Sequence, residues 1–296
     1  MSHTDVWTTG RLLTWTTDYL KENGADSPRL DAEVLLAYAS QCQRIELYTS
    51  YEQDPGEQAR NSFRALVKQR ADGTPVAYLV GQREFFSLPF HVSPAVLIPR
   101  PETEFVVTTA IDIIRQHYAD QTTVNLIDVG TGSGAIAVAI AKQLPNCHIR
   151  AIDSSTSALE IAEQNIAQHQ VQTQVSSLQS DLLEQIATEE QVHIVVSNPP
   201  YVSQDEYDQL DSTVRDHEPQ DALLAGPSGL EVYDRLIPQA AAHLYPQGWL
   251  ILETSPQLHQ ALTSQLNESP FYETISVIND LAGLPRVVTA QRNTAN

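Results

Sequence analysis

The apolar residues of the first eighty positions repeat at the spacing of helices. The pattern predicts one helix that ends near Gly24, a second that begins near Pro28 and a third from about Pro55. Their apolar residues are Leu12, Leu13, Trp15, Tyr19 and Leu20 in the first helix, Ala32, Leu35, Leu36 and Ala39 in the second, and Phe63, Leu66 and Val67 in the third. We see no catalytic cluster among them. Residues 1–75 are therefore interpreted as a small helical domain with, at most, a docking role.

Between residues 76 and 100 the pattern becomes that of strands, broken by prolines and preceded by Gly81. The strand-like residues are Phe85, Phe86, Leu88, Phe90, Val92, Val96, Leu97 and Ile98. We expect a β-hairpin here that links two domains. The charged segment Arg100–Thr103 then leads into an apolar helix, and its charges fit a helix cap as well as they fit a functional site.

From Val124 onward, strand and helix patterns alternate. The expected strands are Val124–Val129, His148–Ile152, Val175–Leu178, Val192–Ser197, Trp249–Leu252, Tyr272–Val277 and Arg286–Ala290, and the expected helices are Ala135–Leu144, Ala158–His169, Val232–Leu244 and Gln257–Leu266. Repeated strand–helix–strand units predict an α/β fold with a parallel sheet covered on both faces. The last two strands would add an antiparallel edge. This second domain is expected to span residues 101–296.

Composition narrows the function classes. The chain has 296 residues, 42% of them hydrophobic and 18% charged, which is typical of a globular protein with two domains. Its 37 acidic and 17 basic residues give a net charge of −20, which argues against a broad phosphate-binding surface. Cys42 and Cys147 are too few for a disulfide framework or a metal site. The chain shows no apolar run of transmembrane length and no signal peptide, so we expect a cytoplasmic protein.

A glycine-rich loop, Gly130-Thr131-Gly132-Ser133-Gly134, joins the strand at Val124–Val129 to an alanine-rich helix. Backbone N–H groups at such a helix start attract anionic or polar ligand atoms. Alone, the loop is equally compatible with a simple tight turn. Asp153, however, ends the next strand about twenty residues on, where a carboxylate can accept both ribose hydroxyls of an adenosine.

The spacing of the glycines indicates which adenosine compound is bound. The loop reads Gly-x-Gly-x-Gly and not the G-x-G-x-x-G of dinucleotide-binding proteins. Asp128, just before it, suits a ligand with a positive centre, which favours S-adenosylmethionine over a pyrophosphate. After the third strand, Asp181 can accept from the adenine amino group while Leu182 covers the adenine face.

The strand Val192–Ser197 ends in Asn198-Pro199-Pro200-Tyr201. Two prolines stop the strand, and the carboxyl ends of parallel strands are where open α/β sheets bind ligands. In isolation these residues are equally well explained as a proline-terminated strand with an asparagine turn. Next to the glycine-rich loop and the two acids, they would instead complete one crevice.

This crevice suits methyl transfer to an amide nitrogen. Such a nitrogen is a poor nucleophile because its lone pair is delocalised, so the protein must hold and aim it. The side-chain oxygen of Asn198 and the carbonyl of Pro199 can accept its two N–H bonds, while Tyr201 packs on the flat group. No base is needed before attack, because the N–H becomes acidic only after the methyl group is attached.

The chain resembles the bacterial release-factor glutamine methyltransferases (the HemK/PrmC family) over nearly its full length. The similar segments are Ser27-Pro28-Arg29-Leu30-Asp31-Ala32-Glu33, Arg83-Glu84-Phe85, Leu97-Ile98-Pro99-Arg100-Pro101-Glu102-Thr103-Glu104, the glycine-rich loop, Ser197-Asn198-Pro199-Pro200-Tyr201, and Glu218-Pro219 with Ala222-Leu223. Asn-Pro-Pro-Tyr alone is shared with adenine methylases of DNA, whereas the Ile-Pro-Arg-Pro-Glu-Thr segment is far more specific.

The resemblance implies a helical domain that recognises the release factor, followed by a seven-stranded, Rossmann-like class I methyltransferase domain. It implies that the loop Gly130–Gly134, Asp153, Leu182 and Asn198 contact S-adenosylmethionine, and that Asn198–Tyr201 hold the glutamine of a Gly-Gly-Gln motif. A monomer in the cytoplasm is expected, with no direct nucleic-acid or membrane binding. Two departures stand out: Leu182 replaces a frequent aromatic residue, and Thr254-Ser255 follow Glu253 where an aliphatic-glycine or His-Gly pair is usual.

Two other functions remain open from the sequence. An adenine-N6 methylase of nucleic acid would use Asn-Pro-Pro-Tyr to present the exocyclic amine of a flipped base. That function calls for a basic duplex-binding surface, which a chain at −20 without a lysine or arginine cluster does not offer. A non-catalytic binding module on the same fold is disfavoured by the intact loop, acid and Asn-Pro-Pro-Tyr.

Overall fold

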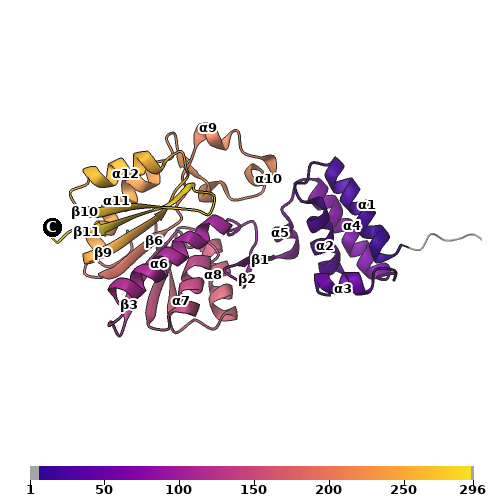
Figure 1. Ribbon diagram of the computed structural model, residues 1–296, viewed down its shortest axis with the longest axis horizontal. Helices are drawn as coiled ribbons and strands as arrows, with labels where there is room; N and C mark the ends of the chain where they lie inside the picture. Colours follow the sequence, from indigo (N-terminus) through magenta and orange to yellow (C-terminus); the bar gives the residue numbers. More distant parts are fainter. Residues whose placement is uncertain (1–6, 295–296) are drawn as a thin grey trace, which may run out of the picture. The chain divides into compact units, whose positions relative to one another are not determined.

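A computed structural model describes residues 7–294 and divides the chain into two compact units (Figure 1). The first contains the residues up to Gly81 together with Ser212–His217, and the second contains Gln82–Asp211 and the residues from Glu218 onward. The boundary at Gly81 lies a few residues after the expected one because a short helix, α5 (Val76–Val80), continues the first unit. Gly81 ends this helix with φ 69°, a left-handed conformation that favours glycine.

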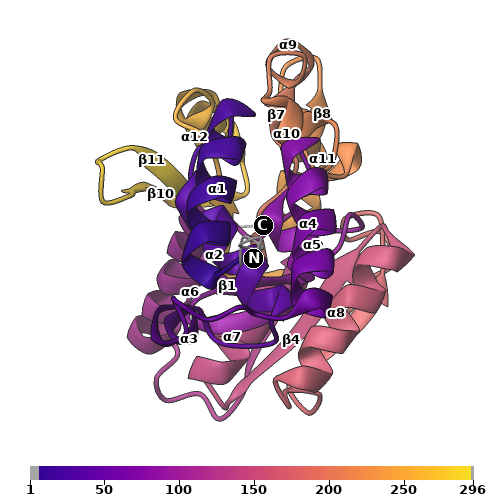
Figure 2. The same cartoon turned by 90° about the vertical axis from the view of Figure 1, so that its right-hand side faces the viewer.

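The three helices predicted for the first unit are confirmed. They are α1 (Thr9–Glu22), α2 (Pro28–Ala39) and α4 (Glu57–Ala71), which are drawn in Figures 1 and 2. Their buried apolar side chains form one shared core. The unit also contains α3 (Arg44–Thr49) and α10 (Ser212–Arg215), which are too short for a periodic pattern to reveal.

The second unit begins with the predicted hairpin, whose strands are β1 (Gln82–Phe85) and β2 (Leu88–His91). The strand-like pattern at Val96–Ile98, in contrast, is not a strand. Pro94 and Pro99 remove backbone donors there, and the N–H of Ile98 donates to the carboxylate of Glu218 at 3.2 Å, so the segment has no neighbouring strand to pair with.

A seven-stranded sheet forms the centre of this unit, in the order β10-β11-β9-β6-β3-β4-β5. Its strands are β3 (Val124–Val129), β4 (Cys147–Asp153), β5 (Val175–Gln179), β6 (Val192–Ser197), β9 (Leu244–Glu253), β10 (Tyr272–Asn279) and β11 (Pro285–Arg292). Strands β5, β4, β3, β6 and β9 pair in parallel, while β11 and β10 pair antiparallel. The predicted parallel sheet with an antiparallel edge is confirmed.

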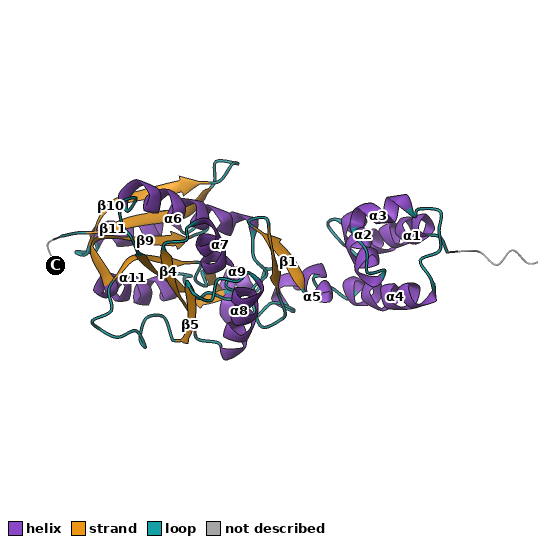
Figure 3. Ribbon diagram, turned by 90° about the horizontal axis from the view of Figure 1, so that it is seen from below, coloured by secondary structure: helices purple, strands orange, loops and turns teal. Residues whose placement is uncertain are grey.

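Helices cover both faces of the sheet, as the nearly continuous burial of the central strands β3 and β6 requires (Figure 3). The longer helices of the unit are α6 (Glu104–His117), α7 (Ala135–Gln143), α8 (Thr156–Gln168), α11 (Glu231–His243) and α12 (His259–Glu268). Leu126 and Ile194 pack on the face with α6 and α7, whereas their neighbours Ile127 and Val195 pack on the face with α11 and α12.

The loop after β6 contains short elements that the sequence pattern did not reveal. They are β7 (Val202–Ser203), α9 (Gln204–Tyr207), the 3-10 turn η2 (Gln220–Ala222) and β8 (Leu224–Gly226); a further 3-10 turn, η1 (Pro101–Thr103), leads into α6. Strands β7 and β8 pair in parallel, which returns the chain to the carboxyl edge of the sheet. Among the residues that the structure describes, no helix is long and apolar enough to span a membrane.

Candidate active site

A cavity of about 660 Å³ opens at the carboxyl ends of β3, β4 and β6, which is the size of pocket that encloses a small organic ligand. Nine of the residues predicted from the sequence line it: Gly130, Thr131, Gly132, Ser133, Asp153, Asp181, Leu182, Asn198 and Pro200. Three others, Gly134, Pro199 and Tyr201, are not part of its lining. The order of the strands thus brings together side chains that lie far apart in the sequence.

The glycine-rich loop leaves room for a ligand against its backbone. Gly130, Gly132 and Gly134 all have positive φ, and a side chain at Gly132 would meet no protein atom within 4 Å. The open side of Gly132 therefore faces free space in which a ligand can approach the main chain. Gly134 serves a different purpose, since it begins α7 and a side chain there would touch Ala162 on α8.

Asp128 supports the loop from below and does not line the cavity. Its carboxyl is fully buried and accepts from the Thr131 hydroxyl at 2.7 Å and from the Ala137 N–H at 3.2 Å. Burial raises the pKa of Asp128 to about 7. The expected contact between Asp128 and a cationic ligand is thus replaced by a structural role, in which the carboxyl fixes the loop to the start of α7.

Asp153 ends β4 at the wall of the cavity. Its two oxygens accept from the N–H groups of Gly132 and Ser155, each at 2.9 Å. Burial raises its pKa, while these backbone hydrogen bonds lower it. A carboxylate oxygen can accept more than one hydrogen bond, so Asp153 is oriented by the protein and still has lone pairs for ligand hydroxyls.

Asp181 and Leu182 line the cavity beyond Asp153. Asp181 is exposed and forms an ion pair with Arg235 on α11 at 2.7 Å. Leu182 has φ 49°, an unusual conformation for a leucine, and its side chain packs against the core beneath α11. Leu182 thus offers an apolar side chain at the wall of the cavity, against which the ring of a purine can pack.

Asn198 reaches the cavity from the end of β6, where the Ser197 hydroxyl fixes the strand by donating to the Val129 carbonyl at 2.8 Å. The Asn198 amide nitrogen donates to the hydroxyl of Thr103 at 3.1 Å. Among the described residues, no hydrogen bond to the side-chain oxygen of Asn198 is observed. This oxygen is therefore the acceptor that the site offers to a ligand.

Tyr201, which is half-buried, contacts the buried carboxyl of Glu253. The Tyr201 hydroxyl donates to Glu253 Oε1 at 3.3 Å, and the Tyr233 hydroxyl donates to the backbone carbonyl of Glu253 at 2.7 Å. Burial raises the pKa of Glu253 to about 7 and raises the pKa of Tyr201 as well. Thr103 and Glu253 were not among the residues predicted for the site, although Thr103 belongs to the Arg100–Thr103 segment whose role the sequence left open.

The same segment contributes one wall of the cavity through Arg100. Its guanidinium donates to Glu218 Oε1 at 2.5 Å, and Glu218 is almost fully buried. The extended chain at Ala95–Arg100 and the segment Pro219–Leu224 both line the cavity, so this ion pair fastens two of its walls together.

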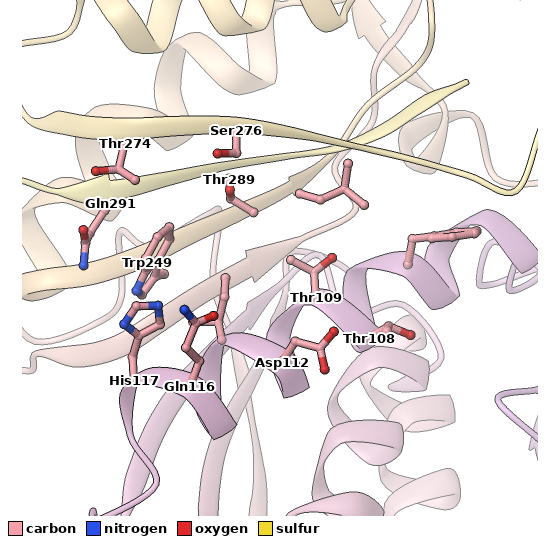
Figure 4. A pocket seen from close by; sticks show the side chains of 13 residues that line it. Thr108, Thr109, Asp112, Gln116, His117, Trp249, Thr274, Ser276, Thr289 and Gln291 are labelled. Atoms are coloured by element: carbon pink, nitrogen blue, oxygen red, sulfur yellow. The ribbon is translucent and has the colours of Figure 1, made fainter. Parts of the chain in front are cut away.

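Another hollow, of about 470 Å³, lies between α6 and the strands β9, β10 and β11 (Figure 4). Threonine, serine and glutamine side chains surround it, and the rings of His117 and Trp249 lie 5.2 Å apart at one end. It shares no lining residue with the cavity at Asn198. Within residues 7–294, no group of His, Cys, Asp or Glu side chains forms a metal site.

Comparisons with solved structures support the fold. The hMettl16 catalytic domain in complex with the MAT2A 3'UTR hairpin 6 aligns with a TM-score of 0.57 at 16% identity, covering 78% of this chain and 82% of that one. A methyltransferase from Pyrococcus furiosus aligns with a TM-score of 0.51 at 16% identity, covering 78% and 98%. At this identity the likeness confirms the predicted methyltransferase fold and no more.

Sequence comparisons are more specific. The model of the PrmC N-terminal domain matches residues 11–81, and that of the methyltransferase small domain matches residues 107–215. The release factor glutamine methyltransferase of Rhodopirellula baltica is 47% identical over 291 residues and covers 98% of both chains. Its counterpart in Koribacter versatilis is 37% identical and covers 94% of this chain and 96% of its own. The chain therefore belongs to the release factor glutamine methyltransferase family.

Proposed function

We propose that the protein transfers a methyl group from S-adenosylmethionine to the side-chain amide nitrogen (N5) of the glutamine in the Gly-Gly-Gln motif of class I peptide chain release factors. The observation that carries this proposal is the arrangement at Asn198. Its amide nitrogen is occupied by Thr103 while its oxygen remains available in the cavity. A fixed acceptor of this kind suits an N–H group of the substrate.

The cavity fits S-adenosylmethionine by its shape and donor set. The open side of Gly132 lets the ligand approach the backbone, and Asp153 offers acceptors for the ribose hydroxyls. Asp181 and Leu182 would receive the adenine amino group and ring face. The bound cofactor supplies a methyl group on a positively charged sulfur.

The protein's part in the reaction is to hold and aim the acceptor. The Asn198 oxygen and the Pro199 carbonyl would accept the two N–H bonds of the glutamine amide, which places the nitrogen in line with the methyl carbon. As the new nitrogen–carbon bond forms, the carbon–sulfur bond breaks. The methylated amide then releases one N–H proton, so no general base has to act before the transfer.

The helical unit is proposed to dock the release factor. Among residues 7–294 there are ten exposed large hydrophobic side chains, and six of them lie in this unit: Trp7, Trp15, Leu30, Tyr38, Ile45 and Tyr48. Trp15 stacks on Tyr19 with ring centroids 5.1 Å apart, which gives a rigid aromatic surface. Exposed aromatic side chains of this kind are enriched at protein interfaces and support a protein partner.

A labelling experiment tests the proposal. The protein is incubated with methyl-labelled S-adenosylmethionine and either a class I release factor or duplex DNA. We expect label in the glutamine of Gly-Gly-Gln and none in DNA. Label in adenine and none in the release factor would instead support the nucleic-acid function that Asn-Pro-Pro-Tyr alone allows.

A further inference from the structure

Glu253 and Thr103 form a polar chain that leads to Asn198. The two side chains are buried, and Thr103 lies in η1 at the start of α6 while Glu253 ends β9. The Thr103 hydroxyl accepts from the Asn198 amide nitrogen at 3.1 Å, and the same hydroxyl lowers the pKa of the Glu253 carboxyl. The three residues thus connect the interior of the sheet to the acceptor end of the cavity.

The chemistry of these groups determines which of them donates and which accepts a hydrogen bond. A carboxylate only accepts hydrogen bonds, and a threonine hydroxyl has a single proton to donate. Glu253 Oε1 receives the Tyr201 hydroxyl, whereas Oε2 is buried and has no hydrogen-bond partner among the described residues. A buried carboxylate oxygen is costly without a donor. The Thr103 proton is therefore best directed at Glu253.

The direction at Thr103 then determines the orientation of Asn198. Once its proton is directed at Glu253, Thr103 can offer only lone pairs to Asn198. The nitrogen of the asparagine amide must face Thr103, and the oxygen must face the cavity. The opposite orientation would place an N–H group of Asn198 against the N–H groups of a glutamine amide, where donor would meet donor.

We propose that Glu253 and Thr103 are positioning residues that orient the side-chain amide of Asn198 for the substrate glutamine. This inference rests on the proposed function, because it concerns how the acceptor amide is held. Neither residue touches the reacting atoms. Their effect is to make one of the two orientations of the Asn198 amide much more favourable than the other.

This arrangement of donors and acceptors requires the charged form of Glu253, so the rate of methyl transfer should depend on pH. Tyr201, Tyr233, Glu102 and Arg286 also surround the carboxyl: burial and Glu102 raise its pKa, and Tyr201, Thr103 and Arg286 lower it, with a result of about 7. When Glu253 is protonated, its O–H can donate to Thr103, and the Thr103 proton is then free to turn toward Asn198. Turnover should therefore fall as the pH drops through about 7.

Matched variants test this inference. Thr103→Val keeps the shape of the side chain and removes the hydroxyl, Thr103→Ser restores it, and Glu253→Gln removes the carboxylate. Thr108→Val is the control, because Thr108 lies on α6, which follows Thr103 directly, and its hydroxyl donates to the Glu104 carbonyl, away from Asn198. The assay follows methyl transfer to a release factor and, separately, the affinity for S-adenosylmethionine by calorimetry.

We expect Thr103→Val to lower kcat by on the order of tenfold to a hundredfold, with cofactor affinity changed less than threefold, roughly as for loss of a preorganised hydrogen bond. Thr103→Ser should recover most of the activity. Glu253→Gln should lower kcat and abolish the decline of activity between about pH 8 and pH 6. Thr108→Val should match the unmodified protein.

Three results would overturn the inference. The first is a kcat of Thr103→Val equal to that of Thr108→Val, and the second is an unchanged acid limb of the pH profile in Glu253→Gln. The third is a loss of affinity for S-adenosylmethionine as large as the loss of kcat, because it would indicate a general disturbance of the cavity. If the unmodified protein itself labels no release factor, the proposed function fails, and that result is distinct from a failure of the positioning roles.

Discussion

Glu218 accepts a hydrogen bond from Arg100, 118 residues earlier in the chain, at 2.5 Å. The same carboxylate accepts from the Ile98 N–H at 3.2 Å, and its side chain is 2% exposed. Through these bonds one buried acid holds two walls of the cofactor cavity. Because Arg100 and Glu218 lie far apart in the sequence, this ion pair forms only when the chain folds.

Removing this tie should both destabilise the protein and loosen the cavity. Glu218→Ala leaves the Ile98 N–H and the Arg100 guanidinium without their acceptor, and we expect a loss of about 2 kcal/mol in the free energy of unfolding. Glu218→Gln keeps an acceptor for Ile98 and should lose less. Urea unfolding measures both. If Glu218→Ala were as stable as the unmodified protein, the ion pair would contribute nothing to the free energy of unfolding.

Asp153 should contribute directly to cofactor affinity. Its oxygens are oriented by the Gly132 and Ser155 N–H groups and accept the ribose hydroxyls in our account. We expect Asp153→Ala to weaken S-adenosylmethionine binding by ~1.5–3 kcal/mol in a calorimetric titration. Asp181→Ala should cost less, because Asp181 is exposed and already paired with Arg235. Unchanged affinity in Asp153→Ala would remove this residue from the site.

The sequence predicted most of the sheet and its helices because their hydrophobic patterns are long and regular. The strand Val124–Val129 and the glycine-rich loop that follows lie where expected, and the structure places the predicted loop, Asp153 and Asn198 around one cavity. Local pattern was misleading at Val96–Ile98, where Val96 and Leu97 line the cavity, Ile98 is buried, and none of the three pairs with a strand.

The support beneath the site could not be predicted in the same way. Thr103 and Glu253 each look ordinary in sequence, one as part of a helix start and the other as the last residue of a strand. Their importance arises from contact across 95 residues between Thr103 and Asn198 and across 52 residues between Tyr201 and Glu253. Asp128 was assigned to the ligand for its charge, but its side chain points beneath the loop.

The buried acid Asp128 makes stability depend on pH. Its pKa is about 7 in the folded protein and is ordinarily 3.8, so the folded chain holds an extra proton between these values. The corresponding stability is fully present below pH 3.8 and is lost as the pH rises through about 7. Asp128→Asn keeps an acceptor oxygen, and because an amide does not ionise, the variant does not lose stability in this way as the pH rises. Relative to the unmodified protein, the variant should gain about 3 kcal/mol in the free energy of unfolding between pH 5 and pH 8.

Urea unfolding of the Asp128→Asn variant and the unmodified protein at several pH values measures this difference. Other titrating groups affect both proteins alike and cancel in the comparison. A difference between the two proteins that stays constant from pH 5 to pH 8 would contradict a raised pKa at Asp128.

The helical unit should matter for the intact partner and not for the chemistry. Trp15 is 52% exposed, so Trp15→Ala removes an aromatic contact without opening the core. We expect KM for an intact release factor to rise about tenfold, as for a single interface anchor, with kcat nearly unchanged. A short Gly-Gly-Gln peptide should be methylated as before. Tyr245→Ala, an exposed aromatic of the other unit, is the control.

Equal effects of Trp15→Ala on the peptide and on the intact release factor would be inconsistent with docking by the helical unit. So would the same rise in KM in Tyr245→Ala, because it would reflect a general loss of exposed apolar surface.

In the proposed reaction, the side-chain oxygen of Asn198 aims the glutamine amide at the methyl group. Asn198→Ala removes this oxygen and should reduce turnover by on the order of a hundredfold or more, while cofactor affinity falls less because the glycine-rich loop and Asp153 remain. Asn198→Asp keeps an acceptor of the same reach. It loses the N–H₂ that donates to Thr103, so activity should be only partly retained.

The most direct measurement is therefore the rate at which these two variants methylate the glutamine of a Gly-Gly-Gln substrate, followed by mass spectrometry of the modified residue. We expect Asn198→Asp to be measurably faster than Asn198→Ala, with both variants folded by circular dichroism. Equal rates in the two folded variants would mean that the side-chain oxygen of Asn198 is not what positions the glutamine.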